Sequence, residues 1–341
     1  MKKTRIFALV LALCLALTAC NSGRDTASIA SYDGKTVPAG VYLYSLTSAY
    51  GEAAAKRDDT EGELLSGTVE GVPAADWIRD DALNIVKEFV GAEQLYAQQG
   101  LSFDEATAAE IKSSQDSMWN YYGSTLEDKG IARSSLDAVV ENIYKRSAVL
   151  HALYGEGGEQ ELTDEELRAY YSDNYRRVEM LAVMKAGVAD EDKETVAGLL
   201  DSYYDRAVAG EEMLTLIAEE YARQTGSTVE DAAAAVGGDQ TVLVSRDTTG
   251  YPAALIEQIF ATSETGTPQK YTSDDFDVLF VVHDLFEGDM ANADYLAEYD
   301  TLLEGAAKDD FAARLAAAAD DAGYKLNDKA VQRYKVADVV A

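Results

Sequence analysis

Cysteine and histidine are scarce in this sequence of 341 residues, which contains two of each. Cys14 and Cys20 both lie close to the N-terminus, so the body that follows has no thiol for a disulfide, a zinc site or thiol chemistry. His151 and His283 are not spaced as metal ligands. We expect His151 to be a half-buried ring on a helix and His283 to be a surface residue at a strand end. The sequence therefore predicts no metal and no cofactor.

Basic residues are also few, since 29 lysines and arginines stand against 61 acidic residues and the net charge is -32. This balance argues against nucleic acid as a partner, because phosphate binding needs clustered cations. It also opposes a body that lies flat on an anionic membrane. Asp274, Asp275 and Asp277 cluster without the ligand spacing and glycine of a calcium loop, so we expect solvated carboxylates.

The sequence has one long apolar run, from Ile6 to Leu17. It is shorter than the roughly 20 residues that span a bilayer, and it is typical of a signal peptide. The segment Leu17-Thr18-Ala19-Cys20 then resembles the lipobox of bacterial lipoprotein precursors. This resemblance implies that residues 1–19 are removed, that Cys20 is the lipid anchor, and that residues 20–28 are a tether. Two acyl chains on one cysteine are sufficient for stable anchoring, so we expect an extracytoplasmic protein that is lipid-anchored to the cell membrane.

Residues 29–174 show a mainly helical pattern that follows a strand or hairpin around Asp33-Gly34. Apolar residues then recur every three or four positions, as on one face of a helix. The two clearest stripes are Ile78, Ala82, Ile85, Phe89, Ala92 and Tyr96, and Leu136, Val140, Ile143, Leu150 and Tyr154. Ser102 to Glu105 and Thr163 to Glu166 have the pattern of capping boxes and predict the starts of two further helices.

Residues 175–287 change to a mixed pattern, and residues 288–341 return to a long helix with a short tail. The mixed segment predicts, in order, a strand over Arg177 to Val183, helices over Val196 to Val208 and Glu211 to Arg223, a strand over Thr241 to Val244, a helix over Pro252 to Phe260 and a strand over Asp277 to Val282. The predicted fold class is therefore α+β, with a mainly helical lobe built from the N- and C-terminal segments around an inserted α+β domain.

Several stretches of the sequence match one known family. They are Tyr32-Asp33-Gly34-Lys35, the predicted helix from Trp77 to Gly100, Leu162 to Tyr171, Gly210 to Tyr221, the Gly237-Gly238-Asp239 turn, Pro252 to Phe260, and Gly266. With them, nearly the whole chain resembles the PrsA/SurA group of extracytoplasmic foldases. The resemblance implies a helical chaperone lobe around a parvulin-like domain of the prolyl isomerase type, a place at the membrane, and unfolded or partly folded exported proteins as partners.

The catalytic positions of that family are not matched. Active parvulins carry a histidine in the first strand, an Asp or Cys after the second helix, and a second histidine in the last strand. Met180, Gln224 and Val278 occupy these positions. Methionine and valine side chains cannot donate a conventional hydrogen bond to a twisted amide, and Gln224 is neutral, so electrostatic stabilisation of the transition state is lost. The resemblance therefore implies a foldase with weak or absent isomerase activity.

Two other functions stay open at this point. One is a peptidyl-prolyl isomerase with an atypical site. The other is a solute-binding lipoprotein of a transporter, which would show repeated strand–helix units from the start of the chain. The aromatic runs Trp119 to Tyr122 and Tyr203-Tyr204 could contact unfolded clients, but we expect them to belong to the core.

Overall fold

The computed structural model describes residues 27–59, 62–189, 193–287 and 289–340, and the chain divides into two compact units. The first unit contains the chain up to Glu161 and from Ala307 onward, and the second is Leu162–Ala306. The protein is α+β with a mainly helical body, which confirms the predicted fold class. The predicted signal peptide, Cys20 and most of the tether lie outside the described residues.

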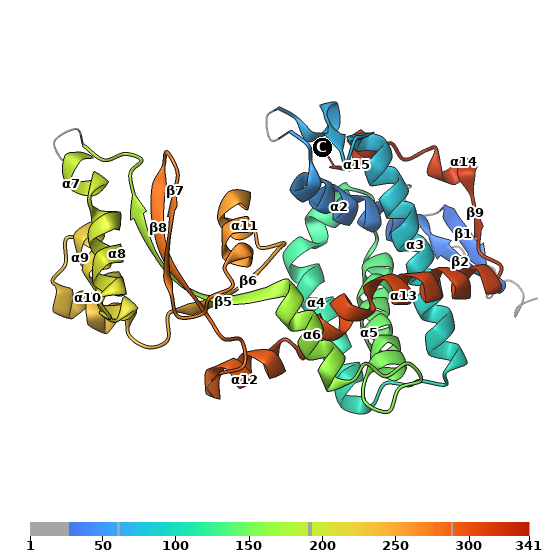
Figure 1. The fold of residues 1–341 in the computed structure, drawn as a ribbon. Coiled ribbons are helices and arrows are strands. Elements are labelled where there is room, and N and C mark those ends of the chain that lie inside the picture. The colour runs from blue at the N-terminus through green and yellow to red at the C-terminus, as the bar shows by residue number, and fades with distance from the viewer. Residues whose placement is uncertain (1–26, 60–61, 190–192, 288, 341) are drawn as a thin grey trace, which may run out of the picture. The chain divides into compact units, whose positions relative to one another are not determined.

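The first unit is mainly helical (Figure 1). Its long helices are α2 (Ala39–Lys56), α3 (Ala74–Gln98), α4 (Glu105–Asp128), α5 (Arg133–Tyr154) and most of α13 (Tyr299–Asp321). Its shorter elements are β1 (Ser28–Tyr32), β2 (Lys35–Pro38), η1 (Leu64–Ser66), β3 (Thr68–Val69), β4 (Val72–Pro73), β9 (Lys325–Leu326), α14 (Asp328–Val331) and α15 (Val336–Val340). Strand β1 lies between β2 and β9, so the beginning and the end of the chain pair in one sheet.

Local sequence signals account for several element ends. Asp33 and Gly34 join β1 to β2 with φ values of 43° and 71°, and a type I′ hairpin turn requires positive φ at both positions. The predicted capping box at Thr163 is confirmed, since its hydroxyl accepts from the Glu166 N–H while the Glu166 carboxylate accepts from the Thr163 N–H at 2.8 Å. The predicted box at Ser102 is wrong. Helix α4 starts after Asp104, because this carboxylate stands directly before the helix and accepts from the Thr107 N–H at 2.7 Å.

Helix α13 lies directly against α3 at Gly91. A Cβ atom at this position would be 2.1 Å from the carbonyl oxygen of Leu315, so only glycine allows the two backbones to come this close. Nearby, the rings of Tyr154 and Phe311 pack edge to face with centroids 5.9 Å apart. Lys87 Nζ and an Asp320 carboxylate oxygen form an ion pair at 2.8 Å. These contacts join the C-terminal helix to the core of the first unit.

The second unit is built on a four-stranded antiparallel sheet with the order β6-β5-β8-β7. The strands are β5 (Tyr175–Met184), β6 (Thr241–Ser245), β7 (Pro268–Thr272) and β8 (Phe276–His283). The helices are α6 (Asp164–Asn174), α7 (Lys193–Ala197), α8 (Leu199–Val208), α9 (Met213–Thr225), α10 (Val229–Val236), α11 (Ala253–Ala261) and α12 (Asp289–Ala297).

Alternate residues of the central strands cover the two faces of this sheet, as strand geometry requires. One face packs on α8 and α9 through Leu181, Val183, Leu279 and Val281. The other packs on α11 through Val178, Val278, Phe280 and Val282. Figure 1 shows α11 on one side of the strands and α7 to α10 on the other. Both faces of β8 are therefore buried, which explains its apolar run from Val278 to Val282.

The elements of the fold also differ from the sequence prediction elsewhere. The sequence does not predict strand β7 or helix α10, because β7 is largely polar and α10 is a short, alanine-rich helix. The expected single C-terminal helix is divided into α12 and α13. Asp277 is not a solvated carboxylate, because it is buried and its Oδ1 accepts from Lys185 Nζ at 2.7 Å.

The second unit extends beyond the predicted domain of residues 175–287 at both ends. An aromatic cluster accounts for the extension. The ring of Tyr171 in α6 lies 5.2 Å from that of Tyr175, 5.8 Å from that of Phe286 and 5.6 Å from that of Tyr295 in α12. Large aromatic contacts of this kind bury much area, so α6 and α12 fold with the sheet.

The described part of the chain contains no helix with the length and apolar character needed to cross a membrane.

Candidate functional site

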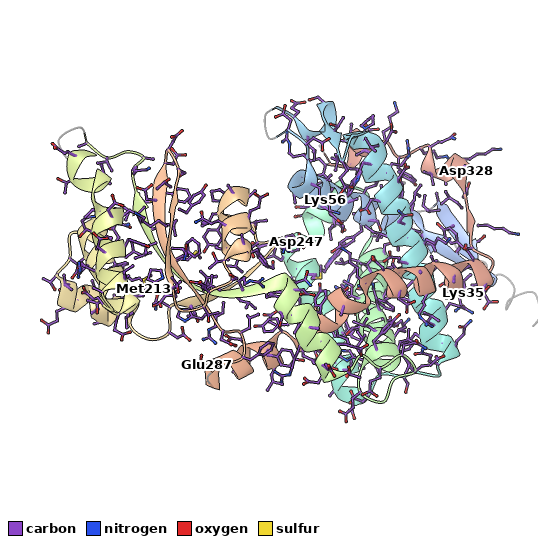
Figure 2. The ribbon with its side chains drawn as sticks, in the orientation of Figure 1. Lys35, Lys56, Met213, Asp247, Glu287 and Asp328 are labelled. Atoms are coloured by element: carbon purple, nitrogen blue, oxygen red, sulfur yellow. The ribbon has the colours of Figure 1, made fainter. Side chains whose placement is uncertain are left out.

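Met180 and Val278 lie on the face of the sheet that packs on α11. Met180 in β5 is opposite Phe280 in β8, and Val278 is opposite Ala182, so the two positions are diagonal neighbours on one face. Val278 is buried and Met180 is partly buried against the same apolar cluster. Figure 2 shows side chains filling the space between these strands and α11. Two positions that are catalytic in the resembled family therefore serve as packing in this chain.

Gln224 lies near the end of α9, the helix that begins at Met213, which is labelled in Figure 2. Its side-chain amide donates to the carbonyl oxygen of Ala182 at 3.0 Å and to Glu220 Oε1 at 2.7 Å. Ala182 is the register partner of Val278, but Gln224 belongs to α9, which packs on the other face of the sheet from Met180 and Val278, so the structure does not bring the three side chains together on one face. The side-chain NH2 group of Gln224 therefore already donates two hydrogen bonds within the protein.

The carboxylate nearest to Gln224 is also engaged. Glu220 is buried, and it accepts from Arg223 Nη2 at 2.5 Å and from the Tyr203 hydroxyl at 3.2 Å. Burial and then the charge of Glu220 raise the pKa of Tyr203 to about 12, so this phenol is protonated at neutral pH. The expectation that Tyr203 belongs to the core is correct. The arrangement joins α9 to α8 through Tyr203 and does not resemble an acid–base pair.

The Gly237-Gly238-Asp239 turn has a structural partner. Asp239 Oδ2 accepts from Arg177 Nη2 at 2.5 Å, and Arg177 Nε donates to the Thr241 hydroxyl at 2.9 Å. Hydrogen bonds from Thr241 and then the charge of Arg177 hold the pKa of Asp239 below its usual range. Gly238, with a φ of +92°, allows the turn that places Asp239 there. This motif therefore fastens β6 to β5.

The two histidines lie away from the isomerase-like positions. His151 is in α5 of the first unit and is half-buried, as expected. His283 ends β8 opposite Arg177, which puts its ring on the other face of the sheet from Met180 and Val278. Its ring is only partly exposed and its Nε2 lies 3.4 Å from Glu179 Oε2, so the expectation of a plain surface residue is only partly right.

The first unit contains an apolar groove with a volume of about 270 Å³. It is lined by residues of α2, α3 and α5, namely Val41, Tyr44, Ser45, Ser48, Ile85, Glu88, Phe89, Val139, Asn142, Ile143 and Arg146. Ile143 is 55% exposed at this groove, although large aliphatic side chains are usually buried. Burial raises the pKa of the Tyr44 phenol, and the neighbouring Tyr122 raises it further. The groove is thus a concave, mostly apolar surface with tyrosines beside it.

Two neighbouring tyrosines of α4 are exposed, which corrects the expectation that they are core. Tyr121 is 79% exposed and Tyr122 is 50% exposed, and their rings stack edge to face with centroids 4.5 Å apart. Trp119 from the same run packs on the core, as predicted. The helical period of α4 turns Trp119 inward and the tyrosines outward, and the sequence pattern alone did not separate them.

Comparison with known proteins finds similar chains among solved structures. No family model matches the sequence, and no curated protein matches it. The foldase protein PrsA from Streptococcus pneumoniae is 15% identical, with a TM-score of 0.39, over 80% of this chain and 97% of that one. PrsA from Lactococcus lactis is 12% identical, with a TM-score of 0.36, over 89% and 96% of the two chains. A peptidylprolyl isomerase (PrsA) from Bacillus cereus is 14% identical, with a TM-score of 0.30, over 84% and 100%. These solved structures belong to the group that the sequence resembles.

Proposed function

We propose that this protein is a membrane-anchored extracytoplasmic chaperone that assists the folding of exported proteins, and that its parvulin-like domain has weak or no isomerase activity. The observation that carries the proposal is the apolar groove of the helical unit with the exposed Ile143. Unfolded clients expose apolar segments, and burial of apolar surface is favourable by about 25 cal/mol per Å². Tyrosines beside the groove add apolar contact with a hydrogen-bonding tip, so such a surface can bind many sequences.

The packing at Met180, Gln224 and Val278 supports the second half of the proposal. Prolyl isomerisation has a barrier of about 18–20 kcal/mol, and lowering it requires polar groups directed at the twisted amide. Met180 and Val278 pack in an apolar cluster, and Gln224 donates to Ala182 and Glu220. The domain keeps its fold because burial of the sheet does not depend on a catalytic set.

Two assays on purified residues 21–341 test the proposal. The protein should slow the aggregation of several unrelated unfolded clients at near-stoichiometric ratios, measured by light scattering. In a protease-coupled assay on proline peptides, it should add little to the uncatalysed rate. A protein with no effect on any client would leave the solute-binding alternative. A rapid catalytic rate that is lost on deletion of residues 175–287 would instead establish an isomerase with an atypical site.

The lipid anchor at Cys20 is part of the proposal and has its own test. The apolar run before it and the lipobox-like Leu17 to Cys20 support it. Labelling of growing cells with a radioactive fatty acid should mark the wild-type protein and should not mark Cys20→Ser. Equal labelling of the two proteins would contradict the anchor. The chaperone assay does not depend on the lipid, so the two claims can fail separately.

A solute-binding lipoprotein is the less supported alternative. Such a protein would begin with repeated strand–helix units. The described first unit instead begins with short antiparallel pairs, β1–β2 before α2 and β3–β4 before α3, and α3, α4 and α5 then follow without a strand between them.

A further inference from the structure

Two arginines of the second unit lie over one aromatic ring. Arg176 is near the start of β5, and Arg246 follows the end of β6. The guanidinium carbon of Arg176 is 4.7 Å from the ring centroid of Phe260, and that of Arg246 is 4.2 Å from it. The two guanidinium carbons are therefore at most about 9 Å apart, close enough to repel each other while the ring quadrupole attracts both.

Within the described residues these two cations form no ion pair, although the protein is very acidic, with 61 acidic residues against 29 basic ones. Arg176 Nη1 donates to the carbonyl oxygens of Ser172 at 2.6 Å and Tyr175 at 2.7 Å. Nε and Nη2 of Arg176 make no hydrogen bond within the described chain. Burial, and then the charge of Arg246, lower the pKa of Arg176, and the charge of Asp173, which forms no ion pair with it, only partly opposes them.

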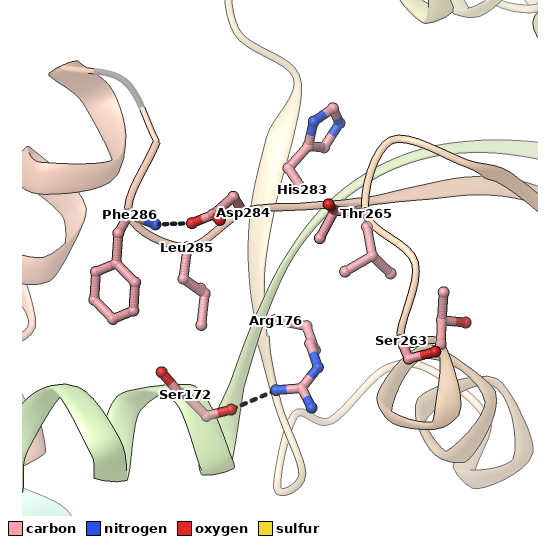
Figure 3. Close-up of a pocket in the computed structure, with 10 residues that line it drawn as sticks. Ser172, Arg176, Ser263, Thr265, His283, Asp284, Leu285 and Phe286 are labelled. Atoms are coloured by element: carbon pink, nitrogen blue, oxygen red, sulfur yellow. Dashed lines mark hydrogen bonds between the residues drawn. The ribbon is translucent and has the colours of Figure 1, made fainter.

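A cavity of about 270 Å³ adjoins Arg176 (Figure 3). The hydroxyls of Ser263 and Thr265 line it and make no hydrogen bond to the part of the protein that the structure describes, so they can donate to a ligand. Leu285 and Phe286 add apolar surface. In Figure 3 the side chains of Leu285 and Arg176 point toward one space below the strand, whereas the ring of His283 points to the opposite side.

We propose that this cavity binds a carboxylate group of a polypeptide. Arg176 would form the charge-assisted hydrogen bonds, Ser263 and Thr265 would donate to the same oxygens, and Leu285 and Phe286 would contact a neighbouring apolar side chain. The proposal rests on the proposed function, because it takes a client polypeptide as the ligand. A singly charged group fits better than a phosphate, since Asp284 also lines the cavity and the net charge of -32 opposes a second negative charge.

Peptide binding tests the proposal directly. Three N-acetylated peptides with the same apolar core are titrated into residues 21–341 by calorimetry in a low-salt buffer without phosphate. One ends in a free carboxylate, one ends in an amide, and one ends in an amide but carries a glutamate. We expect the peptide with a free C-terminal carboxylate, or the amidated peptide with a glutamate, to bind at least tenfold more tightly than the plain amidated peptide. Which of the two binds shows whether the bound carboxylate comes from a chain end or from an acidic side chain.

Variants of the two arginines should respond in a graded way. Arg176→Gln should remove the difference between acid and amide, and Arg246→Gln should reduce it several-fold because it removes only a neighbouring charge. Arg176→Lys keeps the charge but lacks the planar guanidinium, so its difference between acid and amide binding should lie between those of the wild type and Arg176→Gln. Lys270→Gln is the matched control, since it removes one positive charge from the same unit where Lys270 pairs with Asp201 at 2.7 Å. Thermal unfolding of each variant checks that the fold persists. If Arg176→Gln does not fold, the several-fold smaller difference between acid and amide binding in Arg246→Gln is the test of the proposal.

Equal binding of acid and amide by the wild type would overturn the proposal. Tighter binding of inorganic phosphate than of either carboxylate peptide would also overturn it, because the site would then be a phosphate site. Client aggregation is measured on the same samples. Carboxylate-dependent binding without any chaperone effect would contradict the proposed function, whereas a chaperone effect with equal binding of acid and amide would contradict only this proposal.

Discussion

Gly91→Val should lower the free energy of unfolding of the helical unit by roughly 3 kcal/mol, at the upper end of the usual cost of overpacking a core. The added Cβ would lie 2.1 Å from the Leu315 carbonyl oxygen, 2.6 Å from its carbon and 2.8 Å from its Cα. These are backbone atoms, so no rotamer change relieves the clash and α13 must move away from α3. For a unit of this size the melting temperature should fall by about 6–12 °C.

Tryptophan fluorescence measures this effect in the correct unit, because the two tryptophans of the chain, Trp77 and Trp119, both belong to the first unit. Gly51→Ala is the control, since Gly51 is exposed on α2 and an added Cβ would meet nothing within 4 Å. It should stabilise the unit by about 0.5–1 kcal/mol through helix propensity. Unchanged unfolding of Gly91→Val would show that α13 does not pack on α3 as described.

Ile143→Asp should raise several-fold the concentration of protein that is needed to suppress client aggregation. The side chain is 55% exposed at the groove, so its replacement should change the stability of the protein little. A carboxylate at this position must lose water when an apolar client segment docks, and this desolvation is costly. Light scattering of a denatured client at increasing ratios of protein to client gives the measurement.

Val208→Asp is a matched control for the groove variant. Val208 is also a β-branched residue on a helix, it is 59% exposed, and it belongs to α8 of the second unit. Both substitutions add one negative charge, so a general effect of charge would appear in both proteins. Equal loss in the two variants, or no loss in Ile143→Asp, would show that clients do not bind at this groove.

Local pattern in the sequence predicted most elements of the fold. Ile78, Ala82 and Ala92 of the predicted stripe lie on the buried face of α3, whereas Ile85, Phe89 and Tyr96 are only partly buried and Val86 and Val90 complete that face. The Thr163 cap and the Asp33-Gly34 turn also form as predicted. These signals depend on neighbours a few positions away, so they can be recognised without knowledge of the fold. Strand β7 could not be recognised in this way, because its polar residues form a strand only by pairing with β8.

The candidate sites depended on contacts between distant segments. The resemblance identified Met180, Gln224 and Val278, but only the structure shows that Met180 and Val278 share the face covered by α11, while Gln224 reaches the backbone of β5 from α9 on the other face. The groove at Ile143 combines three helices, and no motif marked it. Ile143 belongs to the predicted apolar stripe on α5, and the structure leaves it exposed.

The sequence by itself determined the composition of this protein, the positions of most helices and strands, and the absence of the catalytic side chains of the family that it resembles, and it alone carries the prediction of export and a lipid anchor. Only the tertiary structure decided which apolar residues stay uncovered and which charges stay unpaired. The reason is physical: periodicity places a side chain on a face of its own helix or strand, whereas burial depends on whether another segment covers that face. Ile143 and Arg176 are the two residues at which this decision has the largest consequence for the function proposed above.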